Sequence, residues 1–283
     1  LVALFGIAAG LTVIWYTATF SVLSFLQQSM RVDDTTAQLI TGAGVLAGLF
    51  WFVLFGRLSD RVGRKRPIMI GYVATLVLLF PIFWAIGSAA NPGLATAARR
   101  APVVVSGPHC GYSPFAKQQA DTCGRMLDYL SKKGIAYTTV RAPATVVTVG
   151  GVTVDDPTPA RLDQTLAASG YTLDKVVPGP AGIARMLMAI FVLSILSGAT
   201  YGPVAALLAE MFPPRIRYSS MSIPYHLGTG YFGGFLPFIS QYIVARTGDP
   251  YAGLWYTWIV VAIALVVTGF WLVDATPAKA RRR

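Results

Sequence analysis

The sequence predicts an all-α membrane protein, a six-helix transmembrane bundle that carries a small α+β extracytoplasmic insert. The 283-residue chain is 54% hydrophobic and only 12% charged, whereas a soluble domain has about 25% charged residues. The apolar residues fall in uncharged runs long enough to cross a bilayer, which takes about 20 residues. Between two groups of such runs, residues 91–182 have the composition of a small soluble domain.

Six segments are expected to span the membrane, three before the insert and three after it: residues 1–29, 35–55, 67–87, 186–211, 221–245 and 251–273. The chain is thus divided into a first group of helices (1–90), the insert (91–182), and a second group with a basic tail (183–283). Residues 1–30 carry no charge, whereas a signal peptide would have a basic start and a cleavage site. We therefore expect the chain to begin inside a longer protein.

The basic residues predict the orientation of the chain, because Lys and Arg accumulate in cytoplasmic connections. The second-to-third and fourth-to-fifth connections and the tail are basic, whereas the other connections pair arginine with aspartate. Both ends of the chain are therefore expected in the cytoplasm and the insert outside, in a plasma or inner membrane. The net charge of +11 then reflects these connections and no nucleic-acid surface.

Residue patterns within the insert predict an α+β fold. A hairpin is expected around Gly150-Gly151, and two amphipathic helices are expected to end at Gly134 and Gly170. A domain this small needs additional cross-links or packing to stay folded. The expected strands are residues 102–106, 135–141, 145–149 and 152–154, and the expected helices are residues 115–133 and 158–169.

The two cysteines of the chain, Cys110 and Cys123, both lie in the insert. An extracytoplasmic compartment is oxidising enough to keep a disulfide. The bond would tie the loop before the first insert helix to that helix's second turn, contributing about 3 kcal/mol in the chain-entropy model. A structural disulfide is the preferred interpretation. The alternative is a metal or redox site that uses His109 with both thiols; because no second histidine lies nearby, no metal site is expected.

The connection after the second segment reads Gly56-Arg-Leu-Ser-Asp60-Arg61-Val-Gly63-Arg64-Lys65-Arg66. Its glycines permit a tight reversal, its cations keep it out of the membrane, and its single acid can pair with a cation or a helix N-terminus. This order resembles the signature loop of the major facilitator superfamily, which lies between helices 2 and 3 and again between helices 8 and 9. A generic positive-inside loop is the simpler alternative.

A second motif, Glu210-Met-Phe-Pro-Pro-Arg-Ile-Arg217, follows the fourth segment. It resembles the acidic-x6-arginine pattern that this superfamily places after helices 4 and 10. The resemblance implies a cytoplasmic network of ion pairs that holds the outward-facing state and opens in the inward-facing state. Glu210 as a solvated helix end is the alternative. In this chain the implied network falls on Gly56, Asp60, Arg61, Gly63, Arg64, Lys65, Glu210 and Arg217.

The fifth segment, together with the preceding Glu-x-Phe-Pro, resembles the metabolite:proton symporter branch, which includes permeases for α-ketoglutarate, shikimate, citrate and proline/betaine. His226 departs from this branch, where an asparagine is common. The run Gly228-x-Gly230-x-x-Gly233 matches a dinucleotide fingerprint, but it lies in an apolar segment and predicts close helix packing. The resemblance covers the six segments and implies helices 7–12 of a twelve-helix carrier, with the insert between helices 9 and 10.

Polar side chains inside a membrane are expensive and tend to face a cavity. The candidates for a substrate or proton pathway are Tyr16, Gln27, Tyr201, Tyr225 and His226. His226 is the candidate proton carrier, because imidazole titrates near neutral pH; we expect it to face the bundle interior, and an interhelical hydrogen bond is the alternative role. A main carboxylate or substrate-binding cation would then lie in the other half of the carrier.

We therefore expect the C-terminal half of a proton-coupled symporter for a small polar metabolite, such as a carboxylate or an osmolyte. Its partners would be the substrate, the proton, the lipid bilayer and an N-terminal six-helix half; no cofactor, nucleic acid or enzymatic activity is expected. A first rival is a membrane-anchored sensor or binding protein that uses the insert. A second rival is a thiol enzyme built on His109, Cys110 and Cys123.

Overall fold

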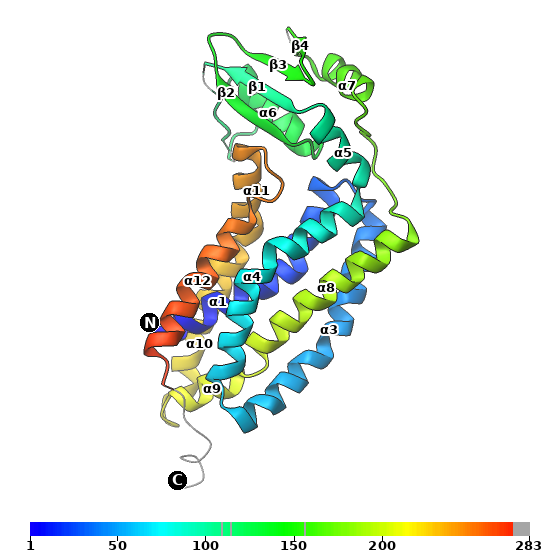
Figure 1. Ribbon diagram of the computed structural model, residues 1–283. Coiled ribbons are helices and arrows are strands. Elements are labelled where there is room, and N and C mark those ends of the chain that lie inside the picture. Colours follow the sequence, from blue (N-terminus) through cyan, green and yellow to red (C-terminus); the bar gives the residue numbers. More distant parts are fainter. Residues whose placement is uncertain (109, 114, 156, 274–283) are drawn as a thin grey trace.

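The computed structural model describes residues 1–108, 110–113, 115–155 and 157–273. These residues form an elongated helical bundle with a small mixed sheet and its helices at one end (Figure 1). We call the bundle end beside the sheet the sheet end. The opposite end, which holds Arg64 and Glu210, is called the basic end.

The first helical stretch, Val2–Ser29, alternates between α-helical and π-helical turns. Insertions of this kind inside α-helices occur frequently at functional sites. The remaining bundle helices lie before and after the sheet in the sequence. The elements of the bundle are η1 (Val2–Ala8), α1 (Ala9–Tyr16), η2 (Thr17–Ser21), α2 (Val22–Ser24), η3 (Phe25–Ser29), α3 (Asp34–Val62), α4 (Lys65–Ala90), α8 (Pro180–Tyr201), α9 (Val204–Met211), α10 (Arg217–Leu227), η4 (Gly228–Gly234), α11 (Leu236–Thr247) and α12 (Leu254–Trp271).

Among the described residues, five helical stretches are long and apolar enough to cross a membrane: Val2–Ser29, Asp34–Val62, Lys65–Ala90, Pro180–Met211 and Leu254–Trp271. The segment expected at 221–245 is helical through α10, η4 and α11, but it is not among these five. Its first part, α10, is rich in serine and tyrosine and has no buried residue. The structure thus supports a mostly helical chain with five candidate spans.

The connection between α3 and α4 is shorter than its sequence predicts. Helix α3 continues to Val62, so Gly56, Asp60 and Arg61 are helical residues. The reversal itself falls on Gly63, whose φ of 94° is open to glycine and strained for other residues. The expectation that Gly56 contributes to the turn is therefore wrong; Gly56 instead lies against the backbone of Gly202 in the next helix pair.

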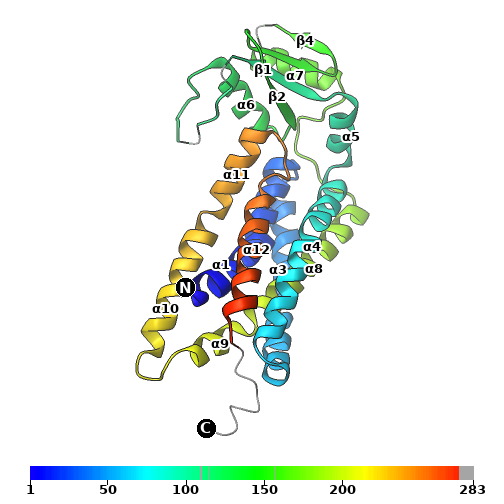
Figure 2. The ribbon, with the colours of Figure 1, turned by 60° about the vertical axis from the view of Figure 1, so that its left-hand side comes forward.

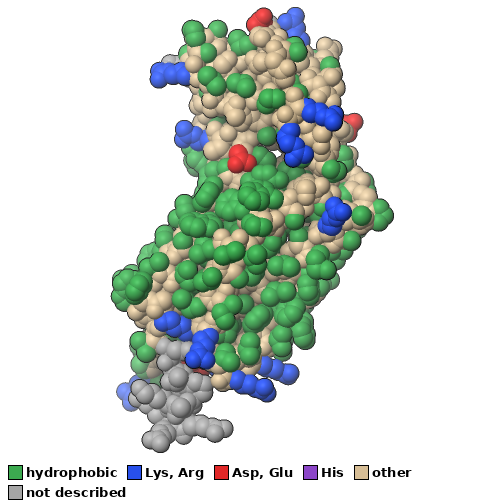
Figure 3. Space-filling view, viewed as in Figure 1, with side chains coloured by type: hydrophobic (Ala, Val, Ile, Leu, Met, Phe, Trp, Pro, Cys, Tyr) green, Lys and Arg blue, Asp and Glu red, His purple; other side chains and the backbone are tan. Residues whose placement is uncertain are grey.

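Helix α8 packs between α3 and α4, and α12 packs against α4 and the first helical stretch (Figure 2). Large side chains such as Ile7, Tyr72 and Phe83 are buried between these helices. The outer surface of the bundle is also apolar: Phe50 is 63% exposed and Trp84 is 56% exposed. Hydrophobic side chains cover the helical part, and Lys and Arg gather toward its ends (Figure 3). Such a surface suits lipid and not water.

The sheet part contains four strands in the order β2-β1-β3-β4. Strands β1 and β2 are parallel and are connected by helix α6, whereas β1/β3 and β3/β4 are antiparallel. Alternate residues of β1 are buried, as expected for a strand with one face on a core. The elements of this part are α5 (Pro92–Arg100), β1 (Val103–Gly107), α6 (Thr122–Lys132), β2 (Tyr137–Arg141), β3 (Val146–Val149), β4 (Val152–Val154) and α7 (Pro159–Ala168).

Four strands lie within two residues of the expected bounds, and Gly150-Gly151 connects β3 to β4, with φ values of 56° and 87° at the two glycines. The helix expected at 115–133 begins later, at Thr122, because Asp121 caps it by accepting the Gly124 N–H at 2.5 Å. Consequently Cys123 lies in the first turn of α6 and not in the second. Helix α5 was not expected from the sequence.

The sheet part is attached to the bundle at several points of the sheet end. The backbone of Val176 exchanges hydrogen bonds with the Arg31 carbonyl (2.8 Å) and the Asp33 N–H (2.9 Å), and Lys175 pairs with Asp34. On the other side, the Tyr137 N–H donates to the Gly248 carbonyl at 3.1 Å. These contacts join the sheet part to the helix ends near residues 31–34 and 245–248.

Candidate functional site

A cluster of charged side chains occupies the basic end and is centred on Arg64. Its guanidinium donates to Oδ1 of Asp60 at 2.5 Å and to Oγ of Ser59 at 2.7 Å, both near the end of α3. Its Nε and Nη2 donate to Oε1 of Glu210 in α9, at 3.3 and 3.2 Å. One arginine therefore connects the α3–α4 connection to the end of the helix pair α8–α9.

The surroundings of Arg64 keep it charged. Its side chain is only 15% exposed, whereas those of Glu210 and Asp60 are 41% and 60% exposed. Burial alone would lower the pKa of Arg64, but the hydrogen bonds that Arg64 donates to Asp60 and Glu210 outweigh burial and raise this pKa. The guanidinium is fully ionised at any physiological pH.

Lys65 extends the cluster to the last helix of the bundle. Its Nζ donates to the carbonyl oxygens of Gly269 and Leu272, each at 2.8 Å. These carbonyls belong to the C-terminal turn of α12, where a cation interacts favourably with the helix dipole. Three parts of the bundle thus meet at residues 59–65: the end of α3, the end of α9 and the end of α12.

The other residues of the expected network have different surroundings. Arg61 is exposed on the last turn of α3. Arg217 begins α10, and its Nε donates to the carbonyl of Phe212 at 3.3 Å, so that it braces the α9–α10 connection. Among the cations considered for Glu210, Arg64 is the one that the structure brings to it.

A second cluster, inside the bundle, consists of aromatic rings and hydroxyl groups. Tyr201, at the end of α8, interacts with the side chains of Thr12 and Tyr225. Its ring centre is 6.3 Å from that of Trp15, and Trp15 lies 5.2 Å from Tyr16. We call Thr12, Trp15, Tyr16, Tyr201 and Tyr225 the aromatic cluster. Its members come from α1, α8 and α10.

His226 lies at the edge of this cluster, and Gln27 lies apart from it. His226 is exposed on α10 and contacts the ring of Tyr225 at 5.6 Å. The expectation that His226 faces the interior of this chain's helices is therefore wrong, because α10 packs with only part of its surface and the imidazole lies on the other side. Gln27 is at the sheet end, where its Nε2 reaches the Asp34 carbonyl at 3.5 Å.

The predicted close packing of the fifth segment is found at two of its three glycines. A Cβ at Gly228 would lie 3.0 Å from the carbonyl carbon of Ala8, and one at Gly233 would lie 2.7 Å from the ring of Tyr16. Gly230 has nothing within 4 Å of a Cβ. η4 thus lies directly on α1, and Thr12 and Thr229 come within 3.4 Å of each other.

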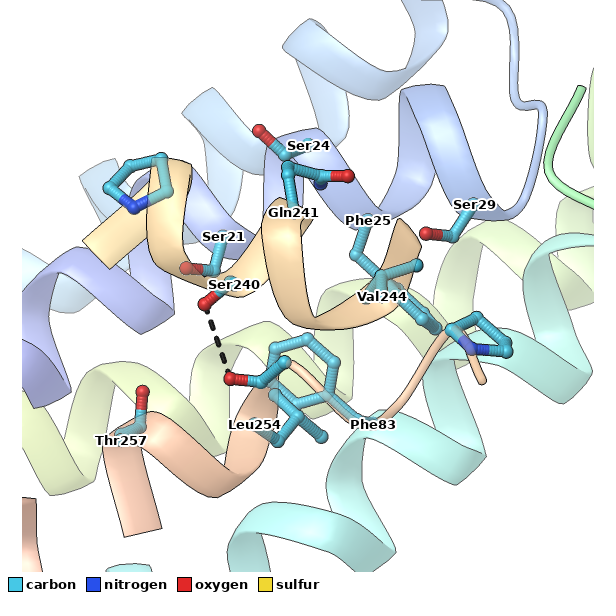
Figure 4. A pocket seen from close by; sticks show the side chains of 13 residues that line it. Ser21, Ser24, Phe25, Ser29, Phe83, Ser240, Gln241, Val244, Leu254 and Thr257 are labelled. Atoms are coloured by element: carbon cyan, nitrogen blue, oxygen red, sulfur yellow. Dashed lines mark hydrogen bonds between the residues drawn. The ribbon is translucent and has the colours of Figure 1, made fainter. Parts of the chain in front are cut away.

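A small cavity with several polar groups in its lining lies near the sheet end and was not expected from the sequence (Figure 4). Ser21, Ser240, Gln241 and Thr257 contribute polar groups to it, and Ser240 donates to the Gly253 carbonyl at 3.2 Å. Its volume of about 30 Å³ is enough for a single water molecule. The polar residues that line it come from three helical stretches, the first stretch, α11 and α12, so no local motif in the sequence indicates them.

In the sheet part, a disulfide joins Cys110 to Cys123 with the two Cα atoms 5.0 Å apart. His109 lies outside the described residues. Within the described ranges, no group of three or more His, Cys, Asp or Glu side chains is arranged to hold a metal ion.

Comparisons with curated proteins find transporters. The chain is 28% identical over 85 residues to a putative proline/betaine transporter of Staphylococcus aureus (strain COL), which is 30% of this chain and 18% of the relative. It is 34% identical over 84 residues to a citrate-proton symporter of Klebsiella pneumoniae, which is 30% of this chain and 19% of the relative. It is 33% identical over 66 residues to the ectoine/proline transporter ProP of Corynebacterium glutamicum, which is 23% of this chain and 13% of the relative.

The similarity thus spans less than a fifth of the length of these relatives. No family model matches the sequence, and no solved structure matches it. Five apolar helices, together with the similarity to transporters, indicate a membrane protein.

Proposed function

We propose that this chain is the C-terminal six-helix half of a secondary active transporter of the major facilitator type. It would move a small polar metabolite, in symport with protons, by rocking against an N-terminal six-helix half around a midplane site. In this proposal the segment of α10, η4 and α11 is the sixth spanning helix. The resemblance of two motifs and the transporter relatives support it.

One observation carries the proposal: Arg64 pairs at once with Asp60 and with Glu210. These residues come from the two motifs that resemble those of the superfamily. Arg64 and Glu210 are 146 residues apart in the sequence. An ionic contact between the ends of separate helices can hold one state of a two-state carrier and be released in the other. We therefore assign Arg64, Asp60 and Glu210 to a latch, with Arg61, Arg217 and Lys65 beside it.

The proposed orientation places the basic end in the cytoplasm and the sheet part outside. The cations of residues 57–66 and 215–217 lie at the basic end, as the positive-inside rule requires of cytoplasmic connections. A disulfide in the sheet part fits an oxidising compartment on the outer side. The apolar surface of α3, where Leu46, Leu49 and Phe50 are exposed, would face lipid or the N-terminal half.

The aromatic cluster favours one substrate class over another. Its groups are rings and hydroxyls, with no basic side chain among them, so it offers little to a tricarboxylate such as citrate. Aromatic rings do attract organic cations, by about 0.5–2 kcal/mol each. We therefore propose a zwitterionic osmolyte with an ammonium group, such as proline or betaine. The carboxylate of that substrate would be bound by the other half of the carrier.

The test is uptake in proteoliposomes that contain this chain together with an N-terminal six-helix half, because the chain alone is proposed to be half of the carrier. Radiolabelled proline, betaine and citrate are compared with and without an inward proton gradient. We expect gradient-dependent accumulation of proline or betaine, and less of citrate. Absence of accumulation of all three, with correct insertion demonstrated by protease protection, would contradict the proposal.

The alternative is a sensor or binding protein, in which the helices anchor the sheet part. It is favoured by the firm attachment of the sheet part at Tyr137 and Val176. A calorimetric titration of the same preparation with these ligands distinguishes the two functions. Ligand binding that is unchanged when Tyr201 is replaced by alanine, without any uptake, would support the sensor. Binding that depends on Tyr201 would support the carrier.

A further inference from the structure

The sheet part contains a feature that transport does not use: a disulfide placed between a surface cleft and the start of a helix. Cys110 is half-buried in the loop that follows β1, whereas Cys123 is 1% exposed within the core. The two cysteines of one bond therefore differ in exposure, and Cys110 is the one that solvent reaches.

The disulfide lies at the end of the central β1 strand and against the crossover helix of the β1–α6–β2 unit. Gly107 ends β1, and a Cβ there would come within 2.9 Å of the Cys110 sulfur and 3.2 Å of the Cys123 sulfur. At position 107, only glycine leaves enough space for the disulfide to pack directly against β1. Cys123 is the second residue of α6, so its sulfur lies at the positive end of the helix dipole.

The first turn of α6 is suited to a sulfur that leaves as an anion. Thiolates are stabilised at helix N-termini and by nearby cations, and a more acidic thiol leaves faster in disulfide exchange. Arg125 lies in this turn and donates to the hydroxyl of Thr122 at 2.9 Å. Asp121 opposes this effect, but its Oδ1 accepts the Gly124 N–H, which disperses its charge.

A cleft of about 350 Å³ opens beside Cys110 and is lined by Gly107, Pro108, Thr139, Val140 and Arg141. Three of these residues belong to β2, which is an edge strand of the sheet. The residues of β2 after Tyr137 are exposed, Val140 by 52%. An exposed edge strand can pair with an extended polypeptide. The cleft thus fits a chain segment that runs along β2 and brings a sulfur to Cys110.

We propose that Cys110–Cys123 is a thiol–disulfide exchange site whose co-substrate is a dithiol carried on an extended polypeptide. A thiolate of the partner attacks Sγ of Cys110 and forms a mixed disulfide. The Cys110–Cys123 bond breaks, and its electron pair leaves with Sγ of Cys123, which then takes up a proton. This site is independent of substrate transport by the helices.

The second step releases the partner. Its second thiol loses a proton and attacks the partner sulfur of the mixed disulfide, and Cys110 leaves as a thiolate that is then protonated. Overall, the partner dithiol is oxidised to a disulfide while Cys110 and Cys123 are reduced to two thiols. Two electrons and two protons pass from the partner to this chain.

The experiment uses the full chain in detergent micelles and two reductants, dithiothreitol and an extended synthetic peptide with two cysteines. Opening of the bond is followed by alkylation and mass spectrometry, and folding by far-UV circular dichroism. We expect both reductants to open the bond without a change in the spectrum. A bond that opens only when the sheet part unfolds would make it a structural staple and overturn the proposal.

Two single-cysteine variants test the assigned order. Cys123→Ser leaves Cys110, and Cys110→Ser leaves Cys123; each is offered an activated peptide disulfide. We expect Cys110 to form the mixed disulfide at least about tenfold faster, because reactivity follows exposure of the thiolate. Equal rates, or faster reaction of Cys123, would overturn the assignment of Cys110 as the attacked sulfur.

A pair of matched edge-strand variants tests the polypeptide partner. Val140→Asp alters β2 beside the cleft, and Val152→Asp alters the opposite edge strand, where Val152 is 58% exposed. We expect V140D to slow the peptide several-fold while leaving the rate with dithiothreitol unchanged, and V152D to change neither rate. If V140D and V152D act alike on the peptide, no segment docks along β2 and the polypeptide co-substrate is wrong.

Discussion

At the scale of single residues, the basic end shows how one side chain can couple two helices. Arg64 is largely buried and satisfies two carboxylates, whereas each carboxylate keeps water contact. An ion pair between exposed groups contributes about 0–1 kcal/mol, so neither pair alone is a strong lock. The arrangement gains strength because one guanidinium, fixed also by Ser59, serves both partners.

The first prediction concerns this latch. Glu210→Gln and Arg64→Gln should each lower the uptake rate by about tenfold, since a loss of roughly 1.4 kcal/mol from one state shifts a two-state population by that factor. Membrane insertion should be unaffected. The measurement is initial uptake in proteoliposomes at equal protein density.

The matched control is Arg61→Gln, which removes an exposed cation from the same turn. Its uptake should stay near that of the unmodified chain. The double variant E210Q/R64Q should be no worse than R64Q alone, because R64Q already removes the contact with Glu210. Unchanged uptake in E210Q would remove Glu210 from the latch.

The second prediction concerns Lys65, which donates to two carbonyls at the end of α12. Lys65→Gln should destabilise the chain by about 1 kcal/mol, the usual worth of a cation at a helix C-terminus. Arg66→Gln, a change at an exposed neighbouring cation, should leave stability within error. Thermal unfolding in detergent compares the two variants, and equal melting temperatures would mean that the Lys65 contacts contribute nothing.

At the scale of elements, the packing of α3 on α8 depends on small residues at every fourth position. Gly48 lies against Ser194, Gly198 lies against Trp51, and Gly202 lies against the backbone of Phe52 and Gly56. Within lipid, close approach of backbones replaces the hydrophobic driving force that packs helices in water. These glycines set how near the two helices come.

The third prediction tests this close approach. A Cβ at Gly202 would lie 2.8 Å from both the Gly56 nitrogen and the Phe52 carbonyl oxygen, and backbone atoms cannot rotate away. Gly202→Ala should therefore destabilise the bundle by about 1–3 kcal/mol through overpacking. Gly42→Ala, in the same helix pair, meets nothing within 4 Å and should be neutral or slightly stabilising. Similar melting temperatures for G202A and G42A would refute the tight contact.

Sequence reasoning succeeds here where a local pattern determines the result. Of the six spans that the apolar runs predict, five correspond to helices long and apolar enough to cross a membrane, and the Gly150-Gly151 turn lies where its hairpin was expected. The start of α6 was missed although its signal is local, because the cap at Asp121 was not recognised. Sequence reasoning also fails where contacts between distant segments decide: the exposure of His226 depends on which side of α10 packs.

The candidate site divides in the same way. Charge and spacing place Arg64 and Glu210 on one end of the bundle, and the structure pairs them. Three other features depend on residues that are far apart in the sequence. They are the contact of Lys65 with the end of α12, the packing of Thr12 and Trp15 in the aromatic cluster, and the cleft beside Cys110. A single sequence carries no signal for such meetings.

At the scale of the whole molecule, the sheet part is built like an insertion. It leaves the bundle at the end of α4 and returns at the start of α8, where Gly182 lies directly against the carbonyl of Ala89. Domain insertion is tolerated when the two ends of the inserted part lie close together at the surface. The bundle and the sheet part also have separate hydrophobic cores.

The last prediction follows from this geometry. Replacing residues 92–178 by a short Gly/Ser linker should leave the helical bundle folded, because the helix ends that it joins are already adjacent. The melting temperature should fall, since the hydrogen bonds of Tyr137 and Val176 and the pair Lys175–Asp34 are lost, each worth about 0.5–1.5 kcal/mol. Size-exclusion chromatography and circular dichroism in detergent measure both effects. The variant Tyr137→Phe, which removes only the hydroxyl contact with the Ala245 carbonyl, should show a fraction of the same decrease. An aggregated or unfolded deletion variant would mean that the sheet part is required for the bundle to fold, and that the two cores form one cooperative unit.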